Sequence, residues 1–113
     1  MMKFDQIPEE LKELFDRKSE KVELSIGQIF CNFNSIPEGI LYIRKGELRL
    51  IYKNKNDEIF TIEKFIKGDI VGLEQILCGT LGTSLRSSSN VEADYLPKKY
   101  FLNFLKNSHN LNN

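Results

Sequence analysis

Residues 41–48 read LYIRKGEL, and residues 65–72 read FIKGDIVG. The first stretch is apolar at residues 41–43, before the Lys45-Gly46 break, and apolar and polar residues then alternate from Glu47 to Lys53. A polar hairpin loop follows at residues 54–57, and a further strand pattern runs over residues 58–65. Alternation with a period of two is typical of β-strands, so the centre of the chain predicts short antiparallel strands joined by tight turns.

The same pattern continues on both sides of this centre. Further strands are predicted at residues 21–26, 28–33, 40–44, 83–88 and 91–95. Gly27, the segment 35–39 and the pair Ser89-Asn90 supply turns between them. A short apolar segment at residues 73–77 predicts one or two helical turns. Many short strands punctuated by Gly and Pro indicate an antiparallel sandwich or jelly roll.

Helices are expected at both ends of this β-rich region. The first covers about residues 8–16, because Pro8 suits a first helical turn and Glu9 and Glu10 then face the positive end of the helix dipole. The second covers about residues 97–106, with aromatic and apolar side chains on one face. The polar residues 107–113, with the only histidine at His109, predict a frayed, solvated tail.

Composition fits one small folded domain. The 113 residues are enough for one core, and 41% of them are apolar, including eight Phe and four Tyr. Sixteen basic and 16 acidic residues give zero net charge, so we expect no direct binding of nucleic acid. No apolar run approaches the length of a membrane helix, so we expect no membrane contact by this segment and a cytoplasmic location.

The reactive residue types show no catalytic or metal-binding spacing. Cys31 and Cys78 have no nearby Cys or His at metal-ligand spacing, so we predict no metal site. We expect two reduced thiols packed as small apolar groups, with a disulfide as the alternative. The run at residues 87–89 fits a strand end and turn better than a nucleophile, since no local base or oxyanion motif accompanies it. The sequence therefore predicts a module that is not an enzyme.

The two stretches quoted first resemble the central part of the cyclic-nucleotide-binding domain family, which includes bacterial catabolite activator proteins and nucleotide-gated channels. That family has a strand of the type L-Y-x-I-x-x-G-x-L and a G-D-x-x-G turn at about this separation. The resemblance covers residues 22–105 and implies a mainly β fold. This fold is an antiparallel jelly-roll (double-stranded β-helix) barrel at about residues 21–96 with flanking N- and C-terminal helices. One such domain is expected over residues 1–113.

The resemblance also implies a ligand site in residues 72–86, which we call the cassette. In the family a short helix follows Gly72, its backbone N–H groups face a cyclic phosphate, a Glu directly after that Gly binds the ribose, and an Arg pairs with the phosphate. This chain departs at both charged positions. Leu73 stands in place of the Glu, with Glu74 one residue late. The position of the Arg falls on Thr83 or Ser84, and the nearest Arg is Arg86.

These departures lead to two hypotheses. The first is a non-catalytic regulatory domain with a degenerate cassette and no cofactor, which acts on the rest of a parent polypeptide or on a protein partner and binds at most a small anion weakly. The cassette is also similar to N-terminal domains of bacterial toxin- and bacteriocin-type ABC exporters, which implies a membrane transporter as the parent. The alternative is a genuine cAMP or cGMP receptor domain of a transcription regulator or other effector, in which Glu74 and Arg86 bind the ligand in a shifted register.

Overall fold

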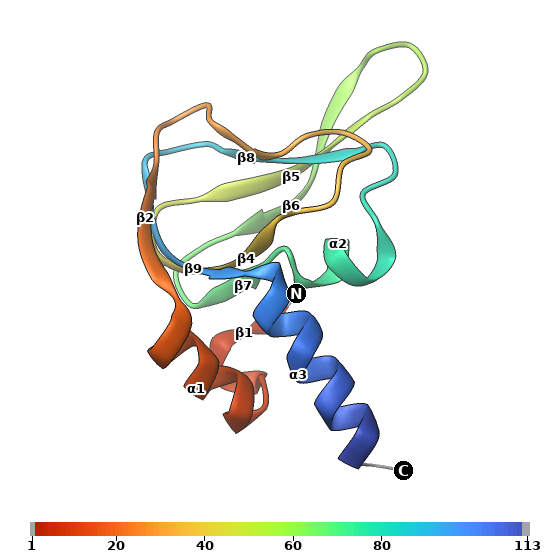
Figure 1. Ribbon diagram of the computed structural model, residues 1–113. Helices are drawn as coiled ribbons and strands as arrows, with labels where there is room; N and C mark the ends of the chain where they lie inside the picture. The colour runs from red at the N-terminus through yellow and green to blue at the C-terminus, as the bar shows by residue number, and fades with distance from the viewer. Residues whose placement is uncertain (1, 112–113) are drawn as a thin grey trace.

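The computed structural model describes residues 2–111 of the chain, with the side chains of residues 2–107, and folds them into two antiparallel sheets and three α-helices (Figure 1). The strands are β1 (Met2–Lys3), β2 (Glu20–Leu24), β3 (Ile29–Cys31), β4 (Gly39–Lys45), β5 (Leu48–Lys53), β6 (Ile59–Phe65), β7 (Asp69–Val71), β8 (Thr83–Ser87) and β9 (Val91–Pro97). The helices are α1 (Glu9–Lys18), α2 (Leu73–Cys78) and α3 (Lys98–Leu111), with a 3-10 turn at Phe4–Gln6.

The sheets form the two walls of a roll. One has the order β1-β7-β4-β9-β2 and the other the order β3-β8-β5-β6. All neighbouring strands are antiparallel. This arrangement confirms the predicted mainly β jelly-roll fold with helices at both ends.

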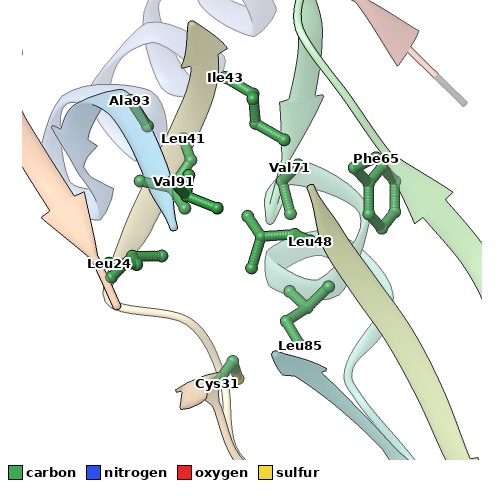
Figure 2. Packing of buried hydrophobic residues seen from close by; sticks show 10 residues of the cluster. All are labelled: Leu24, Cys31, Leu41, Ile43, Leu48, Phe65, Val71, Leu85, Val91 and Ala93. Carbon is green, nitrogen blue, oxygen red and sulfur yellow. The ribbon is translucent and has the colours of Figure 1, made fainter. Parts of the chain in front are cut away.

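The core between the two sheets comes from the inward-facing residues of both walls (Figure 2). Its buried members are Leu24, Cys31, Leu41, Ile43, Leu48, Phe65, Val71, Leu85, Val91 and Ala93. Leu41 and Ile43 alternate along β4 with Tyr42, as the period of a strand requires. Burying one such Leu or Ile side chain contributes roughly 1.5–3 kcal/mol, so this layer supplies a large part of the stability of the roll.

A second apolar cluster attaches the helices to the outer face of the five-stranded sheet. Its buried members are Ile7, Leu11, Phe15, Ile40, Ile70, Leu96 and Phe101. Leu11 and Phe15 lie four residues apart on α1 and therefore share one helix face. Helices α1 and α3 both pack against β9, and α2, which follows β7 in the chain, packs against the same cluster through Leu73 and Ile76 (Figure 1). The outer face of the five-stranded sheet is thus covered by helices. Of the three helices, α2 is the one that lies in the cassette.

The structure differs from the predicted element bounds at several places. Strand β2 ends two residues earlier than predicted, and β3 is one residue shorter at its start and two at its end. Pro97, predicted to open the last helix, is the last residue of β9. The strand β1 and the short strand β7 were not predicted, because two and three residues are too few to show a period. Helix α1 starts one residue later and ends two residues later than predicted. The backbone of α3 is helical through Leu111, so the predicted frayed tail after residue 106 was wrong for residues 107–111. The side chain of His109 lies outside the described residues.

Strand β1 fixes the N-terminal segment against the G-D turn. Met2 lies opposite Ile70, and Lys3 lies opposite Asp69. The next residue, Phe4, stacks on Tyr42 with ring centroids 4.0 Å apart and an interplanar angle of 8°. An offset stack of this kind contributes about 0.5–1.5 kcal/mol beyond the buried area. The aromatic ring of Tyr42 therefore packs on the outer face of the five-stranded sheet.

Candidate functional site

The cassette begins at a glycine that no other residue could replace without strain. Gly72 is the N-cap of α2 and has φ = 104°, in the left-handed region. A Cβ atom at this position would lie 2.9 Å from the carbonyl oxygen of Gly39. The left-handed φ and the close approach of the Gly39 carbonyl both require glycine at this position. With glycine there, β7 can turn directly into the short helix α2.

The two residues after Gly72 take different environments. Leu73 is half-buried and packs against the second apolar cluster, whose members lie between the sheet and the helices. Glu74 is exposed in the first turn of α2 and makes no ion pair among the described residues. The position that resembles the ribose-binding Glu is therefore occupied by a packing residue, and the available carboxylate faces solvent.

The loop that closes the cassette is held by the segment between β3 and β4. Thr80 is buried, and its hydroxyl donates to the carbonyl oxygen of Ser35. The backbone N–H of Gly82 donates to Oδ1 of Asn34 over 3.4 Å. Gly82 has φ = 70°, and an added Cβ would lie 2.9 Å from the ring of Tyr52. The loop from Gly79 to Gly82 is thus fixed to its neighbours by its own polar groups.

Strand β8 places its candidate residues on two different faces. Thr83 lies on the same face as the core residue Leu85, and its hydroxyl donates to the carbonyl oxygen of Thr80 over 3.1 Å. Ser84 is buried on the other face and donates to the carbonyl oxygen of Cys31 over 2.9 Å. The polar groups of both residues are therefore used within the fold.

Arg86 lies on the face of β8 opposite to Thr83. Its Nε atom donates to Oγ of Ser84 over 3.3 Å, and its guanidinium carbon lies 5.2 Å from the centroid of the Phe33 ring. In the sheet it stands opposite Arg49 and Ile29. No hydrogen bond or ion pair joins it to Glu74 among the described side chains. The two charged candidates are near in sequence but are not brought together.

Open volume is small at the start of α2. The cavity there has about 10 Å³ and is lined by Met2, Phe65, Ile70, Gly72, Leu73, Glu74 and Gln75. That volume is about the room of one water, whereas pockets for ligands of drug size have roughly 300–1,000 Å³. A groove of about 670 Å³ lies elsewhere, between the end of α1 and strands β2, β4 and β9. None of its lining residues belongs to the cassette.

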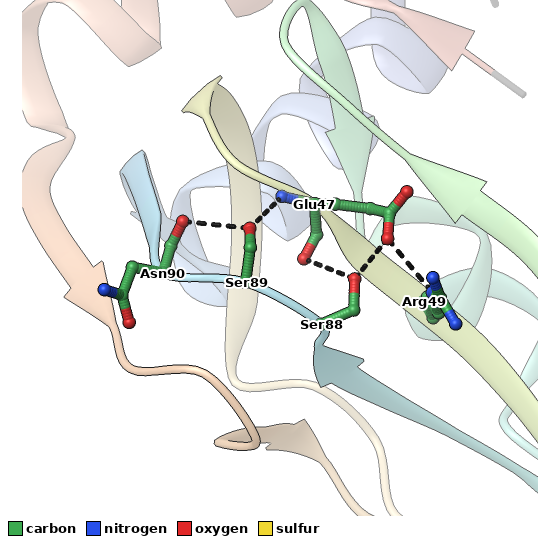
Figure 3. Close-up of polar contacts among 5 residues, drawn as sticks. All are labelled: Glu47, Arg49, Ser88, Ser89 and Asn90. Atoms are coloured by element: carbon green, nitrogen blue, oxygen red, sulfur yellow. Dashed lines mark hydrogen bonds and ion pairs between the residues drawn. The ribbon is translucent and has the colours of Figure 1, made fainter.

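Sequence reasoning missed two sets of polar contacts, one at the end of the roll away from α2 and one on the outer face of the five-stranded sheet. Figure 3 shows the first, in which the Ser88 hydroxyl donates to Oε2 of Glu47 and Nε of Arg49 donates to the same oxygen over 3.0 Å. The backbone N–H of Glu47 donates to Oγ of Ser89 over 2.9 Å. The hydrogen bonds from Ser88 and then Arg49 hold the pKa of the Glu47 carboxyl below its ordinary value. This network joins the β4–β5 turn to the β8–β9 turn.

The second missed contact lies on the outer face of the five-stranded sheet. Nη2 of Arg44 lies 2.8 Å from Oδ2 of Asp94, and the Arg44 guanidinium carbon is 4.4 Å from the Tyr42 ring centroid. Both charged residues line the 670 Å³ groove. The opposite charges of the two residues could have suggested this pair once β4 and β9 were known to be neighbours. The sequence does not give the register between these two strands.

The two cysteines are not bonded to each other and differ in exposure. Cys31 is buried in the core and Cys78 is exposed at the end of α2, so the prediction that both pack as apolar groups was wrong for Cys78. Burial raises the pKa of the Cys31 thiol, and the charge of Glu38 raises it further. Among the described side chains, no group of three or more His, Cys, Asp or Glu residues is arranged to hold a metal ion. Within residues 2–111, no helix has both the length and the hydropathy needed to cross a membrane.

Two antiparallel sheets closed into a roll, with a glycine-started short helix between β7 and β8, define the class of small jelly-roll domains with flanking helices. The sequence profile of the cyclic nucleotide-binding domain matches residues 21–108, and the chain belongs to this family. A search of curated proteins gave no match.

Solved structures of similar fold include several regulators. The catabolite activator protein of Thermus thermophilus has a TM-score of 0.71 and 17% identity over 96% of this chain and 53% of its own. A transcriptional regulator of Thermotoga maritima has a TM-score of 0.67 and 19% identity over 89% of this chain and 79% of its own. A mutant regulatory subunit of a cAMP-independent protein kinase A from Trypanosoma brucei, bound to cAMP in its A site, has a TM-score of 0.72 and 16% identity over 92% of this chain and 41% of its own. The chain spans about half the length of the first and last of these proteins.

Proposed function

We propose that this chain is a non-catalytic regulatory domain that has kept the cyclic-nucleotide-binding fold but binds cAMP and cGMP only very weakly. The observation that supports this proposal is the environment of Leu73, Thr83 and Arg86. Leu73 packs into an apolar cluster, Thr83 bonds to its own loop, and Arg86 stacks on Phe33 on the opposite face of the strand. No charged side chain therefore replaces the Glu and Arg that the family resemblance implies.

The missing contacts have a large expected cost. A hydrogen bond to a charged group contributes roughly 1.5–3 kcal/mol, so the loss of two removes about 3–6 kcal/mol. That corresponds to a loss of affinity of about 100- to 10⁴-fold.

Calorimetric titration with cAMP and cGMP tests this proposal. We expect no binding heat from the wild-type chain at micromolar to submillimolar nucleotide. We expect measurable binding by a variant that carries Leu73→Glu and Thr83→Arg, since these changes restore a carboxylate and a guanidinium at the family positions. A thermal melt of the variant, and of Thr83→Arg alone, checks that the fold survives.

The alternative, a genuine cAMP or cGMP receptor domain, predicts that the wild-type chain binds nucleotide. If the wild-type chain binds either nucleotide at micromolar concentration, the degenerate-cassette proposal is wrong. Arg86→Ala and Glu74→Gln would then abolish binding if those residues act in a shifted register. The present contacts of Arg86 do not favour that register, because its guanidinium is already stacked and hydrogen-bonded.

The setting that we propose for the domain is a larger polypeptide. The relatives of similar fold, of which this chain covers about half, support this reading. The likeness of the cassette to the N-terminal domains of toxin- and bacteriocin-type ABC exporters favours a transporter as the parent, with this domain on the cytoplasmic side. An immunoblot of an extract of the natural source measures the size of the polypeptide that contains this domain. A band near 13.1 kDa would contradict the proposal, and a band of transporter size would support it.

A further inference from the structure

Three cationic side chains stand in a row across the outer face of the four-stranded sheet. Arg86 on β8 lies directly opposite Arg49 on β5, and Arg49 lies directly opposite Lys64 on β6. Leu48 and Leu85, which precede the two arginines, are buried in the core between the sheets. Because side chains alternate along a strand and opposite residues share a face, all three cations point away from that core. We call Arg49, Lys64 and Arg86 the basic row.

The fold compensates only part of the charge of the basic row. Oε2 of Glu47 accepts a hydrogen bond from Nε of Arg49 over 3.0 Å (Figure 3). Among the described side chains, neither Arg86 nor Lys64 forms an ion pair. Like charges that lie directly opposite each other destabilise a sheet. With three cations and one carboxylate, the row carries a surplus of two positive charges, which an anionic partner would offset.

The fold orients both guanidinium groups and leaves their terminal nitrogens free. Nε of Arg86 donates to Oγ of Ser84, and its guanidinium group stacks on Phe33. Nε of Arg49 is bonded to Glu47. The described side chains make no hydrogen bond to the Nη atoms of either arginine. A guanidinium group with free terminal N–H groups pairs readily with a carboxylate, and one that is already held in place loses less freedom on binding.

The basic row lies on an open sheet face and not in a cavity. None of its three residues lines the 670 Å³ groove or the small cavity beside α2. Small molecules usually need a concave site, so this face suits the side chains of a polypeptide better. Ile29 on β3 stands opposite Arg86 at one end of the row and is 44% exposed. It offers an apolar contact next to the charged ones.

We propose that the basic row binds an extended acidic polypeptide segment of the protein that this domain regulates. Neighbouring strands lie about 4.8 Å apart, so the row spans about 10 Å, and carboxylates at alternate positions of an extended segment lie about 6.5 Å apart on one side. Their flexible side chains can therefore reach Arg86 and Lys64 together, while a neighbouring apolar residue contacts Ile29. The zero net charge of the chain provides no strong overall field for a nucleic acid or an anionic membrane. This inference rests on the proposed function only for the origin of the segment.

Fluorescence anisotropy with a labelled peptide, Leu-Ser-Glu-Ser-Glu-Ser-Glu-Ser, tests the proposal. The wild-type chain should bind it at low ionic strength, and a peptide with Gln in place of each Glu should bind about tenfold more weakly. Arg49→Gln combined with Arg86→Gln should raise the dissociation constant about tenfold. Lys45→Gln combined with Lys99→Gln is the matched control. It removes the same charge at exposed positions outside the row and should change the constant less than about twofold.

Two further measurements do not depend on the folding of the double arginine variant. Lys64→Glu changes an exposed side chain on the edge strand and should also weaken peptide binding about tenfold. In NMR titrations of the wild-type chain, the peptide should shift the Nε–H signals of Arg49 and Arg86 and the amide signals of β5, β6 and β8. The amide signals of β2 and β9, which belong to the other sheet, should stay unchanged.

No binding at about 1 mM peptide, with unshifted arginine signals, would overturn the proposal. An equal loss of binding in the Lys45→Gln, Lys99→Gln control would also overturn it, because the attraction would then belong to the whole chain. Tighter binding of a single-stranded oligonucleotide or of phosphatidylserine vesicles, lost in the Lys64→Glu variant, would assign the row to a nucleic acid or a lipid and reject the polypeptide.

Titration with nucleotide separates this proposal from the proposed function. If the wild-type chain binds both cAMP and the acidic peptide, the degenerate-cassette proposal is wrong and the inference about the basic row holds. If it binds neither, the inference about the basic row is wrong and the degenerate cassette holds.

Discussion

The Nζ atom of Lys3 lies 2.7 Å from Oδ1 of Asp69, and the side chain of Asp69 has no exposed surface. Oδ2 of the same carboxylate accepts a hydrogen bond from the backbone N–H of Ile66 over 2.7 Å. The Asp of the G-D turn is therefore held from two sides, by the turn itself and by the N-terminal strand. Its burial makes both contacts important, because a buried carboxylate without partners is costly.

Removal of Asp69 should destabilise the fold strongly. We expect Asp69→Ala to lower the free energy of unfolding by about 2–4 kcal/mol, since the turn loses an acceptor and Lys3 loses its partner. Lys3→Met should cost less, about 1–2 kcal/mol, because Ile66 still bonds to the carboxylate. Urea denaturation measures both. Lys12→Met, which breaks the more exposed pair with Glu9, should change stability by less than about 0.5 kcal/mol, and an equal loss would argue against a special role for Asp69.

Gly72→Ala should be more harmful than the same change at Gly27. Both glycines have positive φ, 104° and 83°, so each Ala carries a left-handed backbone cost of roughly 1–2 kcal/mol. At Gly72 the new Cβ also meets the Gly39 carbonyl at 2.9 Å, whereas at Gly27 nothing lies within 4 Å. We expect a further loss of about 1–2 kcal/mol at Gly72. Equal denaturation midpoints for the two variants would contradict the close approach of β4 to the start of α2.

Stability should depend on pH through Glu47. Its pKa is depressed in the folded state, so its ionised form stabilises the fold above the unfolded pKa of about 4.3. That contribution is lost as the pH falls through the lower folded pKa. Glu47→Gln should therefore be less stable than wild type at pH 7, and the difference should shrink as the pH falls below the unfolded pKa and through the lower folded pKa. Unfolding free energies across this range measure the effect, with Glu74→Gln as an exposed control. A difference that does not shrink on acidification would show that ionised Glu47 is not the stabilising form.

The two thiols should differ sharply in reactivity. Cys78 is exposed, whereas Cys31 is buried with a raised pKa and therefore forms less of the reactive thiolate. We expect iodoacetamide to modify Cys78 rapidly and Cys31 only as the chain unfolds. Peptide mass spectrometry gives the two rates, and the Cys78→Ser variant isolates the slow one. Similar rates in the native protein would mean that the core around Cys31 opens readily.

Much of the roll was predictable because apolar and polar residues alternate along stretches such as residues 47–53, and Gly or Pro marks several of the turns. Strands β4, β5 and β6 each differ from prediction by one residue at most at either end. The opposite faces of Thr83 and Arg86 follow from the same alternation. The packing of Leu73 could not be read in this way, because it depends on where α2 lies against the second apolar cluster.

The polar contacts that stabilise the fold were not predictable for a different reason. Glu47 and Ser88 are 41 residues apart in the chain and meet only because Leu48 stands opposite Ser87 in the sheet. Lys3 reaches Asp69 through a two-residue strand that has no detectable period. Such pairs depend on strand register across long separations, which a single sequence does not specify.

The strand order β1-β7-β4-β9-β2 has a consequence for synthesis on the ribosome. Strands β2 and β4 both pair with β9, and β3 and β5 both pair with β8. Neither sheet can therefore be completed until these late strands have been synthesised. A nascent chain that has reached residue 80 has neither β8 nor β9. Until the last third of the domain emerges, β2 therefore has no partner, and β4 and β5 each have a partner on one side only, β7 and β6. The domain should then assemble in one late, cooperative step, and nascent chains paused before β9 should be the form most exposed to proteases and chaperones.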